Sequence, residues 1–327
     1  MTDLSTATAL DAITERRAER RDFLRYAGGA AASAGALSLL SACGGSTGSA
    51  TPTPTPTSTS STADLDVLNF ALNLEYLEAQ FYCWAAFGQP LTAGLTAGVG
   101  TTGTVTGGAA VPFSDPIVAQ YAREIALDEI AHVTFLRSVL GGGSGAVAMP
   151  AINIAGDATG AFTAAARAAG IVGATELFNP YADDVSFLLG AYLFEDVGVS
   201  AYKGAAPLIT NKVYLEAAAG ILATESYHAG LIRSVLYRKG IDTASIFTKA
   251  KAISDARDSL DGSSDIDQGI GDATTANIVP TDPNGLAYSR TTGQVLNIVY
   301  LNKAAVGWGG FFPSGINGNI RTSAASG

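Results

Sequence analysis

The chain contains only two histidines, and each follows a glutamate by three residues, in Glu129-Ile-Ala-His132 and Glu225-Ser-Tyr-His228. Both motifs lie in segments that we predict to be helical. Residues i and i+3 share one face of a helix, so the carboxylate and the imidazole of each motif can reach the same ion or pair of ions. The two motifs therefore predict a metal site built from two helices.

Two further glutamates complete the pattern. Glu75 is followed seven residues later by Tyr82, and Glu195 is followed seven residues later by Tyr202. The chain thus repeats one unit, a helix with Glu and Tyr and then a helix with Glu-x-x-His. Two such pairs, packed about an approximate two-fold axis, would bring together the complete ligand set of a di-iron or di-manganese site. The expected ligands are Glu75, Glu129, His132, Glu195, Glu225 and His228.

Residues near this set leave alternatives open. Glu78 lies three residues after Glu75, about 60° around the helix, and is either the ligand of the first helix or an acid beside it. The matched spacing from glutamate to tyrosine favours Glu75. Tyr82 and Tyr202 are either hydrogen-bond donors to the ligating carboxylates or core residues. Cys83 is expected to be a small apolar packing residue.

The main alternative to a metal site is a metal-free core in which Glu and His hydrogen-bond to one another. A carboxylate left unpaired in an apolar core costs on the order of several kcal/mol, and metal coordination would satisfy it. Carboxylate with imidazole and without thiolate favours iron or manganese over zinc or copper(I). With only Cys43 and Cys83 in the chain, a four-thiolate zinc site is excluded. We therefore expect two iron or two manganese ions.

Apolar periodicity and helix-end signals predict four long helices. Asp64 is expected to cap the first, Asp115 and Pro116 to begin the second, and Gly240 to end the fourth. A long crossover with a short Ala-rich helix at 162–169 separates the second from the third. This arrangement matches the ferritin-like variant of the all-α four-helix bundle. The expected helices span 64–87, 115–140, 183–205 and 211–239.

The remaining segments of the mature region are less regular. Residues 88–114 are rich in Gly and Thr and are expected to form a long loop, with room for a hairpin. The bundle itself is placed at 64–240. Within 241–327 we expect a helix at 242–260, a helical stretch at 294–304, and a Gly- and aromatic-rich tail that packs against the bundle as a cap.

The amino terminus resembles an export signal. Arg20 and Arg21 begin the run RRDFLR, and a short Gly- and Ala-rich apolar segment follows, as in a twin-arginine signal. That segment ends in LSAC, which resembles the lipobox of bacterial lipoproteins, with Cys43 as the acylated residue; an ordinary cleaved signal is the alternative. Residues 44–63, rich in Thr, Pro and Ser, would hold the domain off the membrane. We expect residues 1–43 to direct export by the twin-arginine machinery, giving a periplasmic or cell-envelope protein with a lipid anchor.

Composition and charge narrow the range of partners. Apolar residues make up 47% of the chain and charged residues 15%, so most of it is expected to be folded. The formal charge of −10 argues against binding to nucleic acid or to anionic headgroups.

Four segments carry a resemblance to a known family: LNFALNLEYLEAQFY, DEIAHVTFLRSVLG, LFEDVGVSAYKGAAPLI and ILATESYHAGLIRSVL. They look like the ferritin-like family that includes plant desiccation-related proteins and many secreted bacterial members. The tail GGFFPSGINGNI is similar to the carboxyl-terminal region of the same family. The resemblance implies that the six residues named above are metal ligands. No segment resembles the Cys-x-x-Cys module of rubrerythrins, and cage-forming ferritins lack this tether and tail, which puts a built-in electron donor and a storage shell in doubt.

Three functions fit these residues. The first is a redox enzyme in stress protection, in which a dinuclear site reacts with peroxide or dioxygen as a catalase-like dismutase or a ferrous oxidase. Catalase-like disproportionation has the advantage that it needs no electron donor. The second is a non-catalytic structural or desiccation-protective scaffold, in which metal only joins the helices. The third is an iron-binding protein of the cell envelope.

Overall fold

The structure, a computed structural model, describes residues 61–326. The expected export signal with Arg20 and Arg21, the lipobox Cys43 and most of the linker lie outside these residues, so their roles stay predictions. Within residues 61–326, no helix combines the length and the apolar character that crossing a membrane requires.

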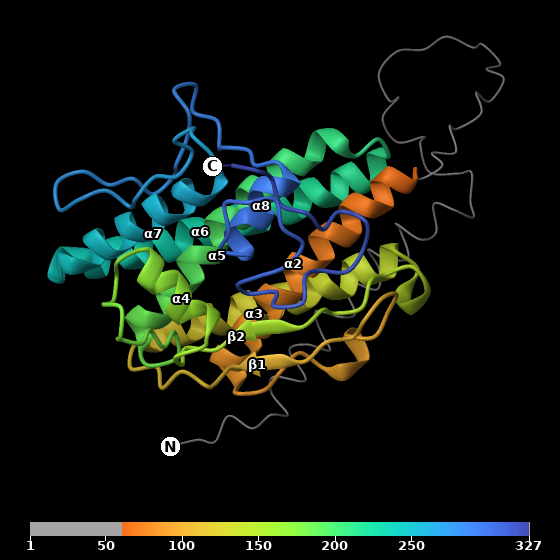
Figure 1. The fold of residues 1–327 in the computed structure, drawn as a ribbon. Coiled ribbons are helices and arrows are strands. Elements are labelled where there is room, and N and C mark those ends of the chain that lie inside the picture. Colours follow the sequence, from red (N-terminus) through yellow and green to blue (C-terminus); the bar gives the residue numbers. More distant parts are fainter. Residues whose placement is uncertain (1–60, 327) are drawn as a thin grey trace, which may run out of the picture. The chain divides into compact units, whose positions relative to one another are not determined.

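Four long helices form a bundle (Figure 1), which confirms the all-α fold predicted from the sequence. The most extensive contacts join the first helix to the second and the third to the fourth, so the bundle consists of two helix pairs. A long crossover connects the two pairs, as in the ferritin-like bundle. The helices are α2 (Thr62–Phe87), α3 (Pro116–Val139), α5 (Asp184–Ala205) and α6 (Lys212–Asp242).

The beginning of α2 differs from the expectation. The cap is Ser61, whose hydroxyl accepts a hydrogen bond from the backbone N–H of Asp64 at 3.1 Å, so the prediction that Asp64 is the cap was wrong. Asp64 lies buried in the first turn instead. Its carboxylate accepts hydrogen bonds from the backbone N–H groups of Thr210 and Asn211, at 2.8 and 3.0 Å, where α6 begins. Asp64 therefore joins the start of α2 to the start of α6.

The other helix ends are close to those predicted. Asp115 caps α3 with Pro116 in the first turn, as expected. Gly240, however, does not end α6, which continues to Asp242. A Cβ atom at Gly240 would lie 2.8 Å from Cζ of Phe247, so the glycine allows the close approach of that ring from the next helix.

The connections contain a small sheet. Strand β1 (Val105–Gly107) pairs in parallel with β2 (Ile152–Ile154), with Val105 opposite Ile152. The hairpin considered for residues 88–114 therefore does not form. The strand partner comes from the crossover, and α3 lies between the two strands in the chain, because parallel strands need a long connection. The crossover also contains the predicted short helix, α4 (Ala161–Ala168). Short 3-10 helices occur elsewhere in the described chain and near the start of the crossover: η1 (Ala93–Leu95), η2 (Gly142–Ser144) and η3 (Ala206–Leu208).

After the bundle come α7 (Ser245–Asp261) and α8 (Thr292–Val299), close to where helices were expected. The aromatic tail packs against the bundle, but along its side. Phe311 lies against Phe194 in the middle of α5, with ring centroids 5.0 Å apart, and the backbone N–H of Asn317 donates to Asn73 of α2 at 3.0 Å. The tail crosses the helices in Figure 1 and does not close one end of the bundle.

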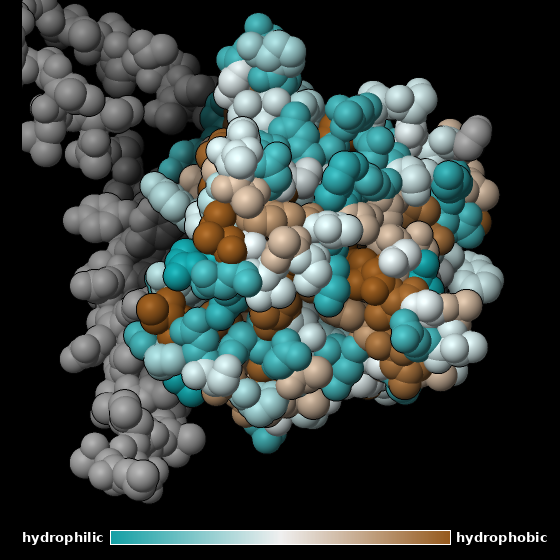
Figure 2. All heavy atoms as spheres, turned by 90° about the vertical axis from the view of Figure 1, so that its left-hand side faces the viewer, coloured by the Kyte–Doolittle hydropathy of each residue, from teal (hydrophilic) through white to brown (hydrophobic). Residues whose placement is uncertain are grey.

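The side of the domain seen in Figure 2 carries apolar residues in several separate patches, with polar residues between them. Single exposed apolar residues are common on protein surfaces and do not by themselves indicate an interface. The strongest structural signals of this protein lie inside the bundle.

A buried ion network attaches the carboxyl-terminal region to the bundle. Asp196 of α5 accepts hydrogen bonds from Arg233 of α6 at 2.7 Å and from Arg257 of α7 at 2.8 Å. Arg257 also pairs with Asp267 at 2.7 Å, and Asp267 pairs with Arg290. All these side chains are at least nine-tenths buried. Residues beyond the bundle are thus held to it by charges that have lost their water, which the sequence pattern did not predict.

We expect Asp196→Ala to lower the free energy of unfolding by about 3–5 kcal/mol, because it leaves two buried guanidinium groups without their shared partner. The matched control is Asp255→Ala on α7, which removes an ion pair with Lys251 whose side chains are 60% and 69% exposed. That change should cost no more than about 1 kcal/mol. Urea unfolding followed by circular dichroism measures both; equal losses in the two variants would contradict the role given to Asp196.

Candidate metal centre

The structure brings all six predicted ligands together in the middle of the bundle. Each comes from the helix on which the sequence places it, and each is buried, with no more than 7% of its surface exposed. The bundle achieves this because the four helices turn their Glu and His positions toward one another. The residues are Glu75 on α2, Glu129 and His132 on α3, Glu195 on α5, and Glu225 and His228 on α6.

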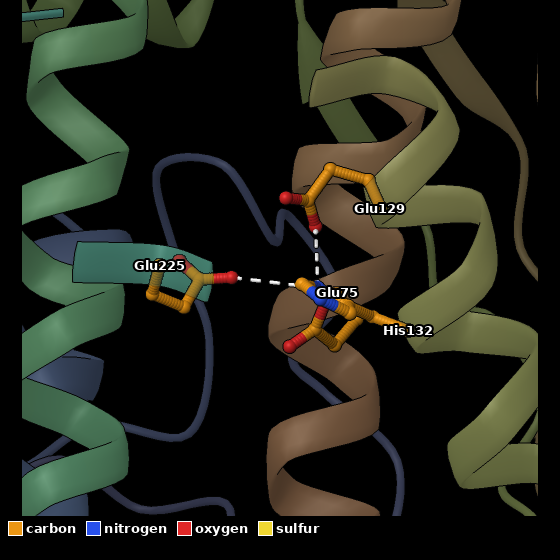
Figure 3. Close-up of side chains that lie close together, drawn as sticks. All are labelled: Glu75, Glu129, His132 and Glu225. Carbon is orange, nitrogen blue, oxygen red and sulfur yellow. Dashed lines mark hydrogen bonds and ion pairs between the residues drawn. The ribbon is translucent and has the colours of Figure 1, made fainter. Parts of the chain in front are cut away.

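One group of ligand atoms surrounds His132 (Figure 3). Its Nδ1 atom lies 3.1 Å from Oε2 of Glu75, 3.5 Å from Oε2 of Glu129 and 3.5 Å from Oε1 of Glu225. Figure 3 shows these side chains converging from α2, α3 and α6. One atom from each of the four residues lies within 4.8 Å of the others, a spacing that a single metal ion can bridge.

A second group surrounds His228. Its Nδ1 atom lies 3.2 Å from Oε1 of Glu129 and 3.5 Å from Oε2 of Glu195. Glu129 belongs to both groups and presents one oxygen to each histidine. The two imidazole rings are 6.2 Å apart between centroids. The site therefore offers two adjacent positions joined by one carboxylate.

The two tyrosines hydrogen-bond across the bundle. The hydroxyl of Tyr82 on α2 donates to Glu195 on α5, and the hydroxyl of Tyr202 on α5 donates to Glu75 on α2. Burial and the nearby carboxylates raise the pKa of both tyrosines well above the ordinary value, so the phenols keep their protons. Of the two alternatives left open by the sequence, the structure shows the tyrosines as donors to the carboxylates. The two bonds are reciprocal, as an approximate two-fold relation between the helix pairs would require.

Asp128 was not singled out from the sequence. Its Oδ2 atom lies 3.4 Å from Nε2 of His228, the ring nitrogen that faces away from Glu129 and Glu195. A carboxylate in this place holds the proton on Nε2 and leaves the lone pair of Nδ1 for a metal. The signal in the sequence was an acid directly before Glu129. Adjacent helical residues point about 100° apart, so its target could be known only once the position of α6 was known.

The electrostatics show that the ligand residues are poorly satisfied by one another. Among residues 61–326, no hydrogen bond is made by either carboxylate oxygen of Glu129 or Glu225, by Oε2 of Glu195 or by Nδ1 of His228, and their contacts are the ion-pair distances given above. Buried polar atoms of this kind normally have partners, and buried charges are normally paired or bound to metal. The metal-free network considered from the sequence therefore leaves the central atoms unsatisfied, whereas two metal ions would satisfy them.

The pKa values reflect the same crowding. Burial raises the pKa of Glu75 to about 7, although the nearby His132 opposes the shift. Burial and repulsion from neighbouring carboxylates also raise the pKa of Glu225 well above its ordinary value. Burial acts in the same direction on Glu129, but His132 and His228 outweigh it and lower its pKa. The surrounding acids raise the pKa of both histidines despite their burial. The site thus holds more buried acids than its two histidines can pair with, and this crowding is what shifts the pKa values.

The other residues weighed from the sequence lie as follows. Glu78 is buried on α2 but belongs to neither group of ligand atoms. Glu124, five residues before Glu129 on α3, is exposed. Cys83 is a free, buried thiol whose pKa burial raises to about 12, in agreement with a packing role.

Comparisons with known proteins agree with this architecture. Residues 63–238 match the ferritin-like domain. The chain is 28% identical to the ferritin-like catalase Nec2 of Nesocodon mauritianus over 271 residues, which cover 79% of this chain and 85% of that protein. It is 31% identical to the desiccation-related protein PCC13-62 of Craterostigma plantagineum over 252 residues, which cover 72% and 76% of the two chains. No solved structure gives a significant match.

The matched region covers more than half of the chain and contains the four bundle helices except the first residue of α2 and the last turn of α6, together with both Glu-x-x-His motifs. This protein therefore belongs to the ferritin-like domain family.

Proposed function

We propose that this protein binds two iron or two manganese ions and disproportionates hydrogen peroxide. The observation that carries the proposal is the pair of adjacent buried ligand groups that share Glu129 and whose central atoms make no hydrogen bond among the described residues. Four glutamates and two neutral imidazoles supply four negative charges. Two divalent ions would balance this charge, which makes the burial of so many acids energetically reasonable.

Bound iron or manganese pairs supply two-electron exchange with a peroxide. In disproportionation one peroxide is oxidised to dioxygen and another is reduced to water, so the two half-reactions balance without an external donor. This suits a chain whose cysteines, Cys43 and Cys83, form no Cys-x-x-Cys module. The similarity to a protein named a ferritin-like catalase supports the same reaction.

The protein's own groups would orient the ligands. The hydroxyls of Tyr82 and Tyr202 fix one oxygen of Glu195 and Glu75, which leaves the second oxygen of each carboxylate facing the histidines. Asp128 fixes His228 in the same way. Side chains that hydrogen bonds already hold lose little further conformational freedom when a metal or substrate binds. A rigid site gains affinity in this way.

A non-catalytic protective function is the second candidate, and the 31% identity to a desiccation-related protein favours it. In that case the ions would only join the two helix pairs and stabilise the bundle. An envelope iron-binding role would likewise require metal without turnover. The candidates differ in one measurable property, the release of dioxygen from peroxide by the metal-loaded protein.

Glu129→Ala is expected to abolish both metal binding and dioxygen release, because the side chain serves both positions. Wild-type protein loaded with Mn(II) or with Fe(II) under anaerobic conditions should contain about two ions per chain by elemental analysis. Glu124→Ala, five residues earlier on the same helix and exposed, is the matched control and should behave as wild type. Two bound ions without dioxygen release would reject the catalase proposal and favour the protective or iron-binding roles; wild-type protein that binds neither metal would reject all metal-dependent ones.

Asp128→Asn should weaken metal binding by about 10- to 100-fold, because the amide no longer favours the proton on Nε2 of His228. Equilibrium dialysis against Mn(II) measures the change, and the melting temperature of the metal-free variant checks that the fold is intact. If affinity is unchanged while the variant folds normally, Asp128 does not position His228.

The metal-free protein is expected to lose stability as pH rises from about 4.5 to 7. Burial raises the pKa of Glu75 from 4.5 to about 7, so the folded state keeps a proton that the unfolded chain has released in this range. The raised pKa of Glu225 acts in the same direction. The raised pKa values of His132 and His228 stabilise the folded state at low pH, and this contribution to stability also decreases as pH rises above 6.5.

Melting temperatures across this pH range, with EDTA and with Mn(II), provide the measurement. Metal should reverse the trend, since ligands bind it in their deprotonated form. Glu75→Gln removes one of the titrating groups and should flatten the metal-free curve. A metal-free wild type whose stability stays constant or rises between pH 4.5 and 7 would contradict the electrostatic account.

A further inference from the structure

Helix α6 turns a regular row of apolar side chains toward solvent. Val213, Tyr227 and Ile241 lie fourteen residues apart on this helix and are 60%, 79% and 48% exposed. Tyr227 is the most exposed large apolar residue in the described part of the chain. Fourteen residues are close to four helical turns, so the three side chains share one face. A single exposed apolar residue needs no explanation, but a repeat of this kind indicates a contact surface.

The positions between the large residues carry small side chains. Gly220 and Ser234 lie midway between them, and Ala223 and Gly230 lie about one turn before and one turn after Tyr227. All four are at least partly exposed. Small residues let the backbone of a second helix approach and leave hollows that a large side chain from that helix can fill. The face thus alternates large side chains with hollows.

The charged residues at the two ends of α6 are arranged in opposite order. Lys212 and Glu216 lie in the first turns, Arg238 and Asp242 lie in the last turns, and all four are exposed. Arg238 and Asp242 pair with each other at 2.6 Å, yet their side chains are 70% and 67% exposed. Tyr227 is the midpoint of the helix. Lys212 lies as many residues before this midpoint as Asp242 lies after it, and the same holds for Glu216 and Arg238.

The face is therefore complementary to a second copy of itself that runs the other way. In an antiparallel pair with a two-fold axis at Tyr227, each residue lies opposite the one at equal distance on the other side of the midpoint. The opposed charges then differ in sign, whereas a parallel pair in register would place each charge against its own copy. The opposed residues are Lys212 with Asp242, Val213 with Ile241, Glu216 with Arg238, and Gly220 with Ser234.

We infer that this protein forms a homodimer through α6, with the two helices antiparallel and Tyr227 at the two-fold axis. Each Tyr227 ring packs into the hollow beside Ala223 and Gly230 of the second copy. The near-heptad spacing follows a left-handed stripe, so the helices cross at about 20°. The apolar row supplies most of the affinity. The exposed charges are individually weak and set the direction and register of the pair. The dimer does not depend on bound metal.

The size of the contact sets its strength. Helix α6 has 31 residues and is about 45 Å long, so a strip about 10 Å wide buries roughly 450 Å² on each copy. A standard interface buries about 800 Å² per partner. The loop beside α6 adds apolar area, because Val279 is 70% exposed and lines a cavity together with Ser226 and Gly230. We therefore expect a dissociation constant in the micromolar range.

The test is the molar mass of the full-length protein as a function of concentration, measured by analytical ultracentrifugation. A Cys43→Ser background removes that cysteine as a source of disulfide-linked dimers. The parent protein should pass from monomer to dimer in the micromolar range, and salt should shift the transition to higher concentration. Tyr227→Glu should raise the dissociation constant at least about tenfold, because it places two like charges at the two-fold axis. Trp308→Glu, which replaces a tail residue that is 65% exposed, is the matched control and should behave as the parent.

An exchange of charges tests the register. Glu216→Arg alone and Arg238→Glu alone should each weaken the dimer at least about threefold, because each brings like charges together between the copies. The two changes combined should restore the affinity, although the ion pair of Arg238 with Asp242 within one copy is lost. A double variant that dimerises no better than the single ones would overturn the register.

Disulfide cross-linking in the same background tests the direction. Ser234→Cys alone should form no linked dimer under mild oxidation, but it should cross-link with Gly220→Cys when the two proteins are mixed, since only these positions come close enough for a disulfide. Self-linking of Ser234→Cys would indicate a parallel pair and overturn the antiparallel one. Circular dichroism verifies that the variants, all at exposed positions, are folded.

Two further outcomes would overturn the dimer itself. A parent protein that stays monomeric well above the micromolar range would show that a second copy does not cover this face. A dimer that Tyr227→Glu leaves unchanged would show that the copies meet elsewhere. Neither result bears on the metal centre, whose tests measure bound ions and dioxygen release.

Discussion

The arrangement of this bundle depends on acids that are placed where water does not reach. Glu129 lies at the centre, with one oxygen toward each histidine, and neither oxygen has a hydrogen-bond partner among residues 61–326. Such a group is costly to bury unless a positive charge accompanies it. The histidines supply part of that charge, and the crossed bonds of Tyr82 and Tyr202 hold the outer carboxylates in place. The burial of these carboxylates therefore links the packing of the helices, the tyrosine hydrogen bonds and the positions of the ligands.

Much of this could be predicted from the sequence because the relevant spacings are local. A glutamate three residues before a histidine must share a helix face with it, whatever the rest of the chain does. The repeated Glu and Tyr spacing then linked two helices to two others. Asp128 could not be placed by the same argument. Its contact with His228 depends on the neighbouring helix that it faces, and a single helix does not contain that information.

Other features were missed or misread because one residue type has several uses. Glycine commonly ends helices, yet Gly240 lies within α6, where the absence of a side chain leaves room for the ring of Phe247. Aspartate commonly caps helices, yet the carboxylate of Asp64 accepts hydrogen bonds from the backbone at the start of a distant helix, α6. The network around Asp196 joins residues from α5, α6 and α7, and its pairs are far apart in the chain. Long-range partners of this kind leave no periodic trace in a sequence.

The crossed tyrosine bonds have a consequence for the order of assembly. Each helix pair is contiguous in the chain and can form by itself as a local hairpin of helices, which favours early folding. One pair alone, however, holds only three of the six expected ligands, and each tyrosine finds its acceptor only on the other pair. The complete site thus comes into existence at the moment when the pairs dock. Metal captured there would bind the docked state and not its separated halves, and so would lengthen the lifetime of the native protein.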